Sequence, residues 1–367
     1  MARRGENIYK RKDNRWEGRY IKDSSGGKTQ YGYVYAKTYR EVREKLNAAK
    51  LGILQPASPK HKTMATYCEE WLVLSRNRVK ESTYVKYYTI INHHILPAFE
   101  RTPPQKISTV TVEQFSHTLL QNALSPKTVR DILAVLRAVL TYCRKQIGAG
   151  FPEIDIIYPK ERKKEMRVLS MEEQKQLISL LLADIDEIKF GILLALLTGM
   201  RIGEVCALKW GNISLKEGVI RIANTMQRLQ DLNSTGDAKT KILVDEAKSD
   251  SSKRIVPLTA QAVALCENMQ VADPEAYILT GKREHFLEPR ALQYRLKKYT
   301  AACGLSDVHF HVLRHTFATR CVEVGFEIKS LSEILGHSST KITLDRYVHS
   351  SLELKRANME KLAAIGL

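Results

Sequence analysis

The chain has few of the features that mark metal sites, disulfide frameworks or membrane spans. Its six cysteines are scattered through 367 residues without ligand or framework spacing, which predicts reduced thiols in a cytoplasmic protein. His309, His311 and His315 are closely spaced, but no His-Glu-x-x-His motif or carboxylate cluster accompanies them, so we expect no metal and no cofactor. The longest apolar run, Phe190 to Leu197, is too short to cross a bilayer, and the basic N-terminus leads into no apolar signal segment.

Acidic residues are also in deficit. The sequence has 40 Asp and Glu against 58 Lys and Arg, a formal net charge of +18 with a sequence pI near 9.5. A surplus of this size predicts a polyanionic partner. Membrane surfaces and acidic proteins also attract basic chains, but here the charge is spread through the whole sequence, as a protein that clamps DNA requires. We therefore expect double-stranded DNA as the partner and no membrane.

Residues 1–55 form a small basic unit, with 14 Lys and Arg against 6 Asp and Glu. Three strand-like runs separated by turns are expected: Asn7–Lys12, Arg15–Lys22 and Lys28–Ala36. Alternation places Tyr31, Tyr33 and Tyr35 on one face of the third strand, and a helix follows from about Thr38. The sequence alone leaves open a β-hairpin module that merely caps the next domain.

Two linkers with prolines, Gln55–Lys62 and Phe151–Glu165, divide the rest of the chain. Helical periodicity extends from 63 to 148, and within it Ser125 followed by Pro126 predicts the start of a helix that Gly148 ends. Beyond Arg167 helices again dominate, with strand-like runs at Gly218–Ala223 and Arg254–Leu258. The fold prediction is a multidomain, mainly α protein: a small three-stranded β-sheet plus helix (1–55), a helical domain (63–150), and a mixed, mainly α domain with a small β-sheet (166–367).

The chain has 16 tyrosines, and Tyr347 taken alone would be interpreted as a core residue. Four polar stretches in the last of these domains indicate a functional role for it instead. The stretches are Thr198–Glu204, Lys248–Leu258, His311–His315 and Leu335–Tyr347. They contribute, in order, Arg201, Lys248, His311 with Arg314, His337 and Tyr347. A spacing of three puts His311 and Arg314 on one helix face. Glu204, one helical turn past Arg201, is expected to orient arginines.

This ordered set resembles the tyrosine recombinase (phage integrase) family, and each of its six residues matches a catalytic position of that family. The resemblance implies that DNA strands are cut and rejoined through a 3′-phosphotyrosyl intermediate, without metal or ATP. It makes Tyr347 the nucleophile, Lys248 the general acid for the departing 5′ oxygen, and His311 the base for Tyr347. His337 would donate a hydrogen bond to the phosphate. His315 is interpreted as a structural, hydrogen-bonding histidine and His309 as a turn residue.

The chemistry explains why two arginines belong in such a site. Breaking a phosphodiester without metal requires positive charge on the non-bridging oxygens as negative charge builds up there. Arginine stays charged and presents a planar fork that matches phosphate, so Arg201 and Arg314 can clamp the scissile group. A tyrosine hydroxyl, with a reference pKa of about 10, must lose its proton as it attacks.

Within the family, the three predicted domains resemble those of integrases of conjugative transposons and related mobile elements. The resemblance implies an arm-type DNA-binding domain at 1–55, a core-binding domain at 63–150 and a catalytic domain at 166–367. It also implies core and arm DNA sites, a homotetramer on DNA, and a tail at Ser351–Leu367 that docks on a neighbouring subunit or on its own domain. Whether an accessory DNA-bending or excision factor takes part stays open.

Several alternatives remain at this stage. The polar insertion Thr225–Glu246 is absent from the shortest family members, and the nearby Lys239, Lys241 and Lys253 compete with Lys248 for the general-acid position. A DNA-binding regulator that keeps the fold without turnover is the rival from another class, and a type IB topoisomerase is the rival enzyme. The intact set of catalytic residues argues against the first, and the arm-like domain argues against the second.

Overall fold

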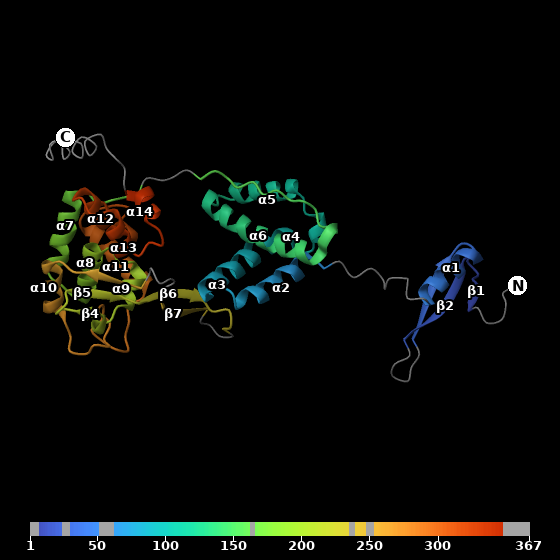
Figure 1. The fold of residues 1–367 in the computed structure, drawn as a ribbon, viewed down its shortest axis with the longest axis horizontal. Helices are drawn as coiled ribbons and strands as arrows, with labels where there is room; N and C mark the ends of the chain where they lie inside the picture. The colour runs from blue at the N-terminus through green and yellow to red at the C-terminus, as the bar shows by residue number, and fades with distance from the viewer. Residues whose placement is uncertain are drawn as a thin grey trace, which may run out of the picture. The chain divides into compact units, whose positions relative to one another are not determined.

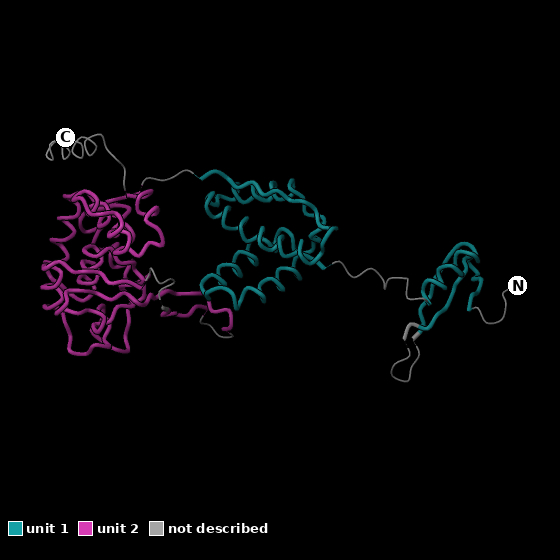
Figure 2. Tube along the Cα trace, viewed as in Figure 1, with its two compact units in different colours: residues 1–161 teal, residues 162–367 magenta. Residues whose placement is uncertain are grey.

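The computed structural model describes residues 7–23, 30–50, 62–161, 166–234, 239–246 and 253–347 (Figure 1). The chain divides into two compact units, residues 1–161 and 162–367 (Figure 2). The described part of the first unit contains two separate hydrophobic clusters, one in the N-terminal sheet and its helix, the other among helices. None of the described helices is long and apolar enough to cross a membrane.

The N-terminal part is the predicted three-stranded sheet with one helix. Strands β1 (Ile8–Lys10), β2 (Trp16–Asp23) and β3 (Gln30–Ala36) are antiparallel in that order, and α1 (Tyr39–Lys50) covers one face. Val42 and Leu46 of α1 are buried against this face. Tyr31, Tyr33 and Tyr35 on the other face stay 42–49% exposed. The sheet therefore presents an aromatic surface to solvent.

The helical part of the first unit begins at α2 (Met64–Arg76). Its further helices are α3 (Glu81–Ile90), the π-helical turn Ile91–Ile95, α4 (Leu96–Phe99), α5 (Thr109–Gln121) and α6 (Pro126–Ile147). The predicted boundaries of α6 are confirmed. Ser125 caps its first turn by accepting from the backbone N–H of Thr128 at 3.1 Å, and Gly148 ends it with a φ of 75°.

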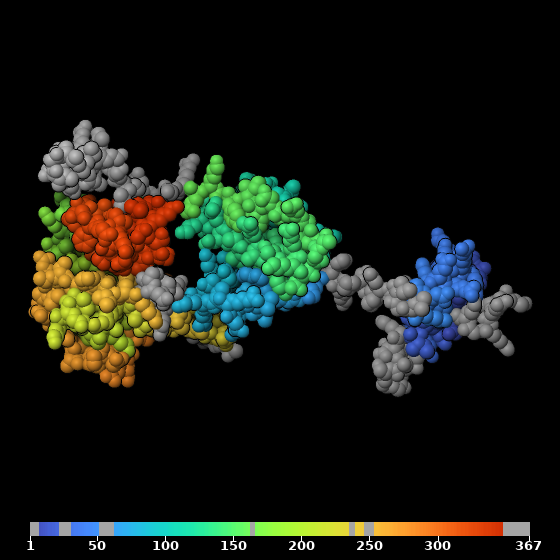
Figure 3. All heavy atoms as spheres, viewed as in Figure 1, coloured from blue at the N-terminus to red at the C-terminus, as the bar shows by residue number. Residues whose placement is uncertain are grey.

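The second unit contains eight described helices and a small sheet. The helices are α7 (Met171–Leu182), α8 (Glu187–Thr198), α9 (Ile202–Ala207), α10 (Ala260–Met269), α11 (Pro289–Ala302), α12 (Phe310–Glu323), α13 (Ile328–Leu335) and α14 (Thr340–Tyr347) among the described residues. The sheet has the order β4 (Ile213–Ser214), β5 (Val219–Ile222), β8 (Arg254–Pro257). The apolar α8 is almost entirely buried and packs against α12. The atoms of α13 and α14 form one continuous red body in the space-filling view (Figure 3).

The segment Thr225–Glu246, interpreted from the sequence as a polar insertion, is a two-stranded antiparallel ribbon over most of its length. Strand β6 (Asn224–Gln230) pairs with β7 (Thr240–Glu246). On β6 only Met226 is buried, so the alternating apolar pattern that identifies a strand is weak here. The ribbon is fastened at its base, where β6 packs on α9.

Gly203 of α9 allows this close approach. A Cβ at this position would lie 2.6 Å from the carbonyl oxygen of Met226 and 2.6 Å from Thr225 Oγ1. Backbone cannot give way as a flexible side chain can, so Gly203→Ala should lower stability by about 1–3 kcal/mol through overpacking. A Cβ at Gly150 would meet only Ile147 Cγ2, at 3.9 Å. Thermal unfolding should show a midpoint below that of the wild type for Gly203→Ala and an unchanged midpoint for Gly150→Ala. Equal midpoints in the two variants would contradict the packing of the ribbon on α9.

Candidate active site

The C-terminal turn of α13 is the point at which the candidate residues meet. Gly336 ends the helix in the left-handed conformation, with φ 64° and ψ 48°. Three arginines donate to three successive carbonyl oxygens of this turn. Arg254 Nε donates to Ile334 at 2.5 Å, Arg314 Nη2 to Leu335 at 2.7 Å, and Arg201 Nη2 to Gly336 at 3.1 Å. The carbonyls at a helix C-terminus lack helical partners and carry partial negative charge, so they attract cations.

A single buried carboxylate holds two of these arginines together. Glu204 is 4% exposed, and its two oxygens accept from Arg254 Nη1 and Nη2, both at 2.9 Å. The same carboxylate accepts from Arg201 Nη1 and from the backbone N–H of Arg201, both at 2.8 Å. Burial alone would raise the pKa of Glu204, but the hydrogen bonds and charges of Arg254 and Arg201 outweigh it and hold the pKa at about 2. The prediction that Glu204 orients arginines is confirmed.

Arg314 is the most deeply buried of the three arginines, with 1% of its surface exposed. Its Nη1 donates to the carbonyl of Gly199, at the left-handed end of α8, at 2.8 Å. Burial and then the charge of Arg201 lower its pKa to about 9, which still leaves it charged at neutral pH. Its two amino groups are thus tied to the ends of two helices, which fixes the plane of the guanidinium.

The ring of His337 lies between Arg314 and α14. Arg314 Nη2 is 3.0 Å from His337 Nε2, and His337 Nδ1 is 2.8 Å from Thr343 Oγ1. Because arginine only donates, Nε2 is the acceptor and the hydrogen of the neutral ring is on Nδ1. Burial, then the charges of Arg314 and Arg201, lower the pKa of His337 to about 3. In this state the Nε2 atom of His337 accepts a hydrogen bond and carries no proton to donate.

Tyr347 is the last residue of α14 and is 6% exposed. Its hydroxyl lies 2.9 Å from His315 Nδ1, and its ring is nearly parallel to that of His337, with centroids 6.4 Å apart. Burial raises the pKa of Tyr347, opposed by the positive charges of Arg314 and Arg346. The hydroxyl therefore keeps its proton at neutral pH and needs a base in order to act as a nucleophile.

The remaining residues that the sequence singled out are the histidines of α12 and its cap, Lys248 and the C-terminal tail. The half-buried ring of His311 meets the ring of His315 edge to face, with centroids 4.5 Å apart, so the structure puts His315 rather than His311 on the Tyr347 hydroxyl. His309 is exposed at the N-terminus of α12. Lys248 and the tail Ser351–Leu367 lie outside the described residues. In the part of the chain that the structure describes, no group of three His, Cys, Asp or Glu could hold a metal ion.

Comparison with known proteins agrees with this geometry. Residues 167–353 match the family model described as "Phage integrase family", and residues 63–120 match "Phage integrase, N-terminal SAM-like domain". The chain belongs to the phage integrase family. It is thus a tyrosine recombinase, an enzyme that cleaves and rejoins DNA strands.

Individual relatives cover most of the chain. A "Tyrosine recombinase XerC-like" of Caldanaerobacter subterraneus subsp. tengcongensis is 25% identical over 362 residues, covering 89% of this chain and 90% of the relative. The Tn1549 transposon integrase in complex with a circular intermediate DNA has a TM-score of 0.66 at 20% identity, covering 81% and 99% of the two chains. A lambda integrase tetramer bound to a Holliday junction has a TM-score of 0.56 at 17% identity, covering 96% and 99%. The two structural likenesses show a shared recombinase fold.

Arg254 is a residue of this site that sequence reasoning missed. Strand alternation along β8 carried the signal: Ile255 is 57% exposed and Val256 only 1%. Arg254 lies two residues before Val256 and therefore on the same, inner side of the strand. An arginine directed inward from a strand needs a buried partner. That partner, Glu204, is 50 residues away in the sequence, so the pair becomes visible only in the folded chain.

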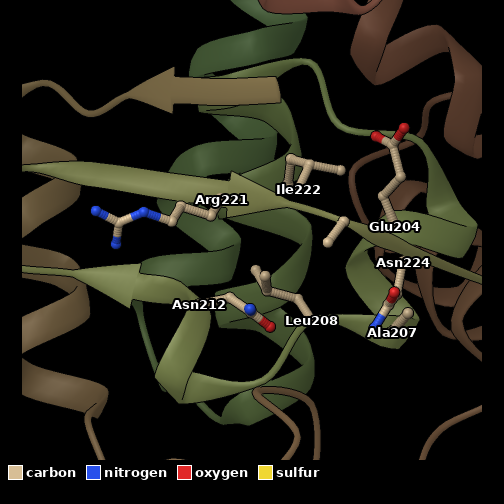
Figure 4. Close-up of a pocket in the computed structure, with 8 residues that line it drawn as sticks. Glu204, Ala207, Leu208, Asn212, Arg221, Ile222 and Asn224 are labelled. Carbon is tan, nitrogen blue, oxygen red and sulfur yellow. The ribbon is translucent and has the colours of Figure 1, made fainter. Parts of the chain in front are cut away.

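The pocket beside Glu204 is too small for a ligand. It lies between α9 and β5 (Figure 4), and its interior has no room for a water molecule. Its lining includes Glu204, Leu208, Arg221 and Asn224, and Figure 4 shows the Arg221 side chain directed away from Glu204. The carboxylate of Glu204 is thus used for arginines.

Breaking the Arg254–Glu204 pair should be costly. Both side chains are 5% exposed, so Arg254→Gln leaves a buried carboxylate with half its partners, at about 3–5 kcal/mol. Arg221→Gln, on the neighbouring strand, is the matched control, because Arg221 and Glu217 are 49% and 55% exposed and such pairs contribute about 0–1 kcal/mol. Urea unfolding measures both. Equal losses of stability in the two variants would show that the buried Arg254–Glu204 pair contributes no more than an exposed ion pair.

Proposed function

We propose that the protein is the site-specific integrase of a mobile element, which it inserts and excises through a 3′-phosphotyrosyl intermediate at Tyr347. The observation that carries this proposal is the meeting of Arg201, Arg314, His337 and Tyr347 at one turn of the second unit. The family membership supplies strand cleavage and rejoining. The likeness to the integrase of the Tn1549 transposon supports a mobile element as the source of the DNA.

Arg201 and Arg314 are proposed to bind the non-bridging oxygens of the scissile phosphate. Each guanidinium has five N–H donors in a planar fork. The contacts within the protein hold the forks in place through two donors of Arg201 and three of Arg314, so the remaining donors can reach phosphate. Such donors act in a buried site without reorganising during the reaction, which is where electrostatic stabilisation is strongest.

Entry of the phosphate is proposed to switch His337. While Arg314 donates to Nε2, this atom cannot donate to a phosphate oxygen. A phosphate that attracts Arg314 releases Nε2, and its negative charge raises the pKa of the ring, so that Nε2 gains a proton and donates. Lys248, matched to the family's general acid, would protonate the departing 5′ oxygen. His311 matches the family's position for the base, but His315 is the residue in contact with the nucleophile.

The domain roles follow from the same proposal. Residues 1–55 would bind arm sites, residues 63–150 would close on the core site, and residues 166–367 would cut and rejoin it, in the cytoplasm. The likeness to the lambda integrase tetramer on a Holliday junction supports a homotetramer on two DNA sites. The tail Ser351–Leu367 would dock on a neighbouring subunit, so that assembly constrains Tyr347. An accessory bending or excision factor remains compatible with this scheme.

Tyr347→Phe tests the proposed reaction. The change removes only the nucleophilic oxygen, so DNA binding should be normal while no covalent protein–DNA adduct forms on a suicide substrate that releases the 5′ fragment. Wild-type protein should accumulate the adduct in the same gel assay. An adduct in the variant would falsify the assignment of Tyr347, and no adduct with the wild type would favour a DNA-binding regulator.

The outer face of the N-terminal sheet supports arm binding. Its exposed tyrosines are interleaved with arginines: Arg19 lies 4.3 Å from the ring centroid of Tyr31, and Arg11 lies 5.5 Å from that of Tyr35. Stacking against Tyr31 orders the guanidinium of Arg19 and leaves its charge available to phosphate, whereas Arg11 is already paired with Glu17 at 2.6 Å. Since α1 covers the opposite face, this face is the one that can approach a DNA groove.

Arg19→Gln should therefore reduce the salt dependence of binding to arm-site DNA. Each lost phosphate contact lowers the log–log slope of affinity against salt by about 0.9. Arg40→Gln is the control with the same change of charge, since Arg40 lies on α1 and is paired with Glu44. Fluorescence anisotropy at several salt concentrations gives both slopes. Identical slopes in the two variants would mean that the tyrosine face does not contact the DNA backbone.

A further inference from the structure

The nucleophile's hydroxyl is in contact with a histidine outside the six family-matched positions. His315 Nδ1 lies 2.9 Å from Tyr347 Oη, and the two residues are 7% and 6% exposed. His315 sits on α12 one turn after His311 and directly after Arg314, so the helix that supplies the phosphate-binding arginine also supplies this contact. The distance and the burial are those of a group that can exchange a proton with Tyr347 without a water molecule.

We propose that His315 is the general base for Tyr347, its Nδ1 taking the phenolic proton as the oxygen attacks phosphorus. This inference rests on the proposed function and deepens it. The neutral ring must then carry its hydrogen on Nε2, so that Tyr347 donates and Nδ1 accepts. His311, edge to face with His315, packs against the base and holds the plane of its ring.

The step balances over the whole cycle. In cleavage, the bond from Tyr347 Oη to phosphorus forms, the bond from phosphorus to the 5′ oxygen breaks, and the general acid protonates that oxygen. The phenolic proton stays on His315 as an imidazolium. In rejoining, a 5′ hydroxyl attacks phosphorus and gives its proton back to the general acid. The bond from phosphorus to Tyr347 Oη breaks, and His315 returns its proton to the leaving tyrosine oxygen. Strand exchange therefore needs no external acid, base or energy source.

The surroundings of His315 fit this task. Burial, then the positive charges of Arg346 and Arg314, lower its pKa to about 4, so the ring is in the neutral, accepting form at pH 7. The titratable and charged groups that face it are His311 and Arg314 on its own helix, His309 at the cap of that helix, and Arg346 and Tyr347 on α14. A scissile phosphate bound near Arg314 and Arg346 offsets their charge and raises the pKa of His315, which makes it a stronger base only when DNA is in place.

His315→Asn separates proton transfer from positioning. The side-chain oxygen of Asn can accept from Tyr347 near the place of Nδ1, but it cannot take up the proton. With a suicide substrate at pH 7, we expect adduct formation to be about 10²–10⁴-fold slower than wild type, with unchanged DNA affinity. The variant's rate should rise steadily with pH because Tyr347 must ionise by itself, whereas the wild-type rate should level off. His285→Asn, at an exposed loop position, should match the wild type.

A more acidic nucleophile supplies the second readout. With 3-fluorotyrosine at position 347, the phenol ionises more easily, so the His315→Asn protein should recover part of its lost rate while the wild type changes little. A purely structural role predicts no such recovery. Wild-type rate and pH profile in His315→Asn, or a loss without recovery, would overturn the proposal. If the wild type itself forms no adduct, the proposed function fails rather than this inference.

A measurement on the unmodified chain covers the case in which His315→Asn does not fold. The ¹⁵N NMR signals of the His315 ring report which nitrogen carries the hydrogen. The proposal expects Nδ1 to be unprotonated at pH 7 in the full-length wild-type protein. A hydrogen on Nδ1, donated to Tyr347, would contradict it.

Discussion

The placing of three guanidiniums on the last turn of α13 is the constraint on which the rest of the site depends. Arg201, Arg254 and Arg314 come from three different elements, and each caps a different carbonyl of that turn. Like charges this close repel each other, and burial adds a desolvation cost. The negative end of the helix and the carboxylate of Glu204 offset both. The turn therefore holds the three arginines together in the absence of any ligand.

The same contacts prepare the chemistry. In the proposed reaction Arg201 and Arg314 are oriented before the phosphate binds, so little ordering has to accompany binding or reaction. His337 belongs to the turn that the arginines hold. The helix α14 begins three residues later, and Tyr347 is its last residue. The proposed nucleophile Tyr347, its partner His315 and the proposed phosphate-binding group Arg314 are thus held by α12, by α14 and by the C-terminal ends of α8 and α13. A shift in any of these helices would move the reacting atoms relative to each other.

Much of this was predictable from sequence because it is local. The strand alternation near Tyr31, the cap at Ser125 and the spacing of His311 and Arg314 each depend on neighbouring residues, and the structure places these elements as predicted. Arg254 was missed because its partner is distant in the sequence, and the β6–β7 ribbon because it buries too little apolar surface to show a period. The contact of His315 with Tyr347 arises from the packing of α12 against α14, which no pattern in one sequence encodes.

A crystal structure of the Tyr347→Phe protein bound to its core-site DNA tests whether the arginines at the α13 turn bind the scissile phosphate. We expect Arg201 and Arg314 each to donate to non-bridging oxygens of one phosphate while the α13 turn keeps its shape. We also expect His337 Nε2 to leave Arg314 for that phosphate and the ring of residue 347 to lie beside it. A scissile phosphate bound elsewhere, with both arginines engaged only by the α13 carbonyls and Glu204, would contradict the account.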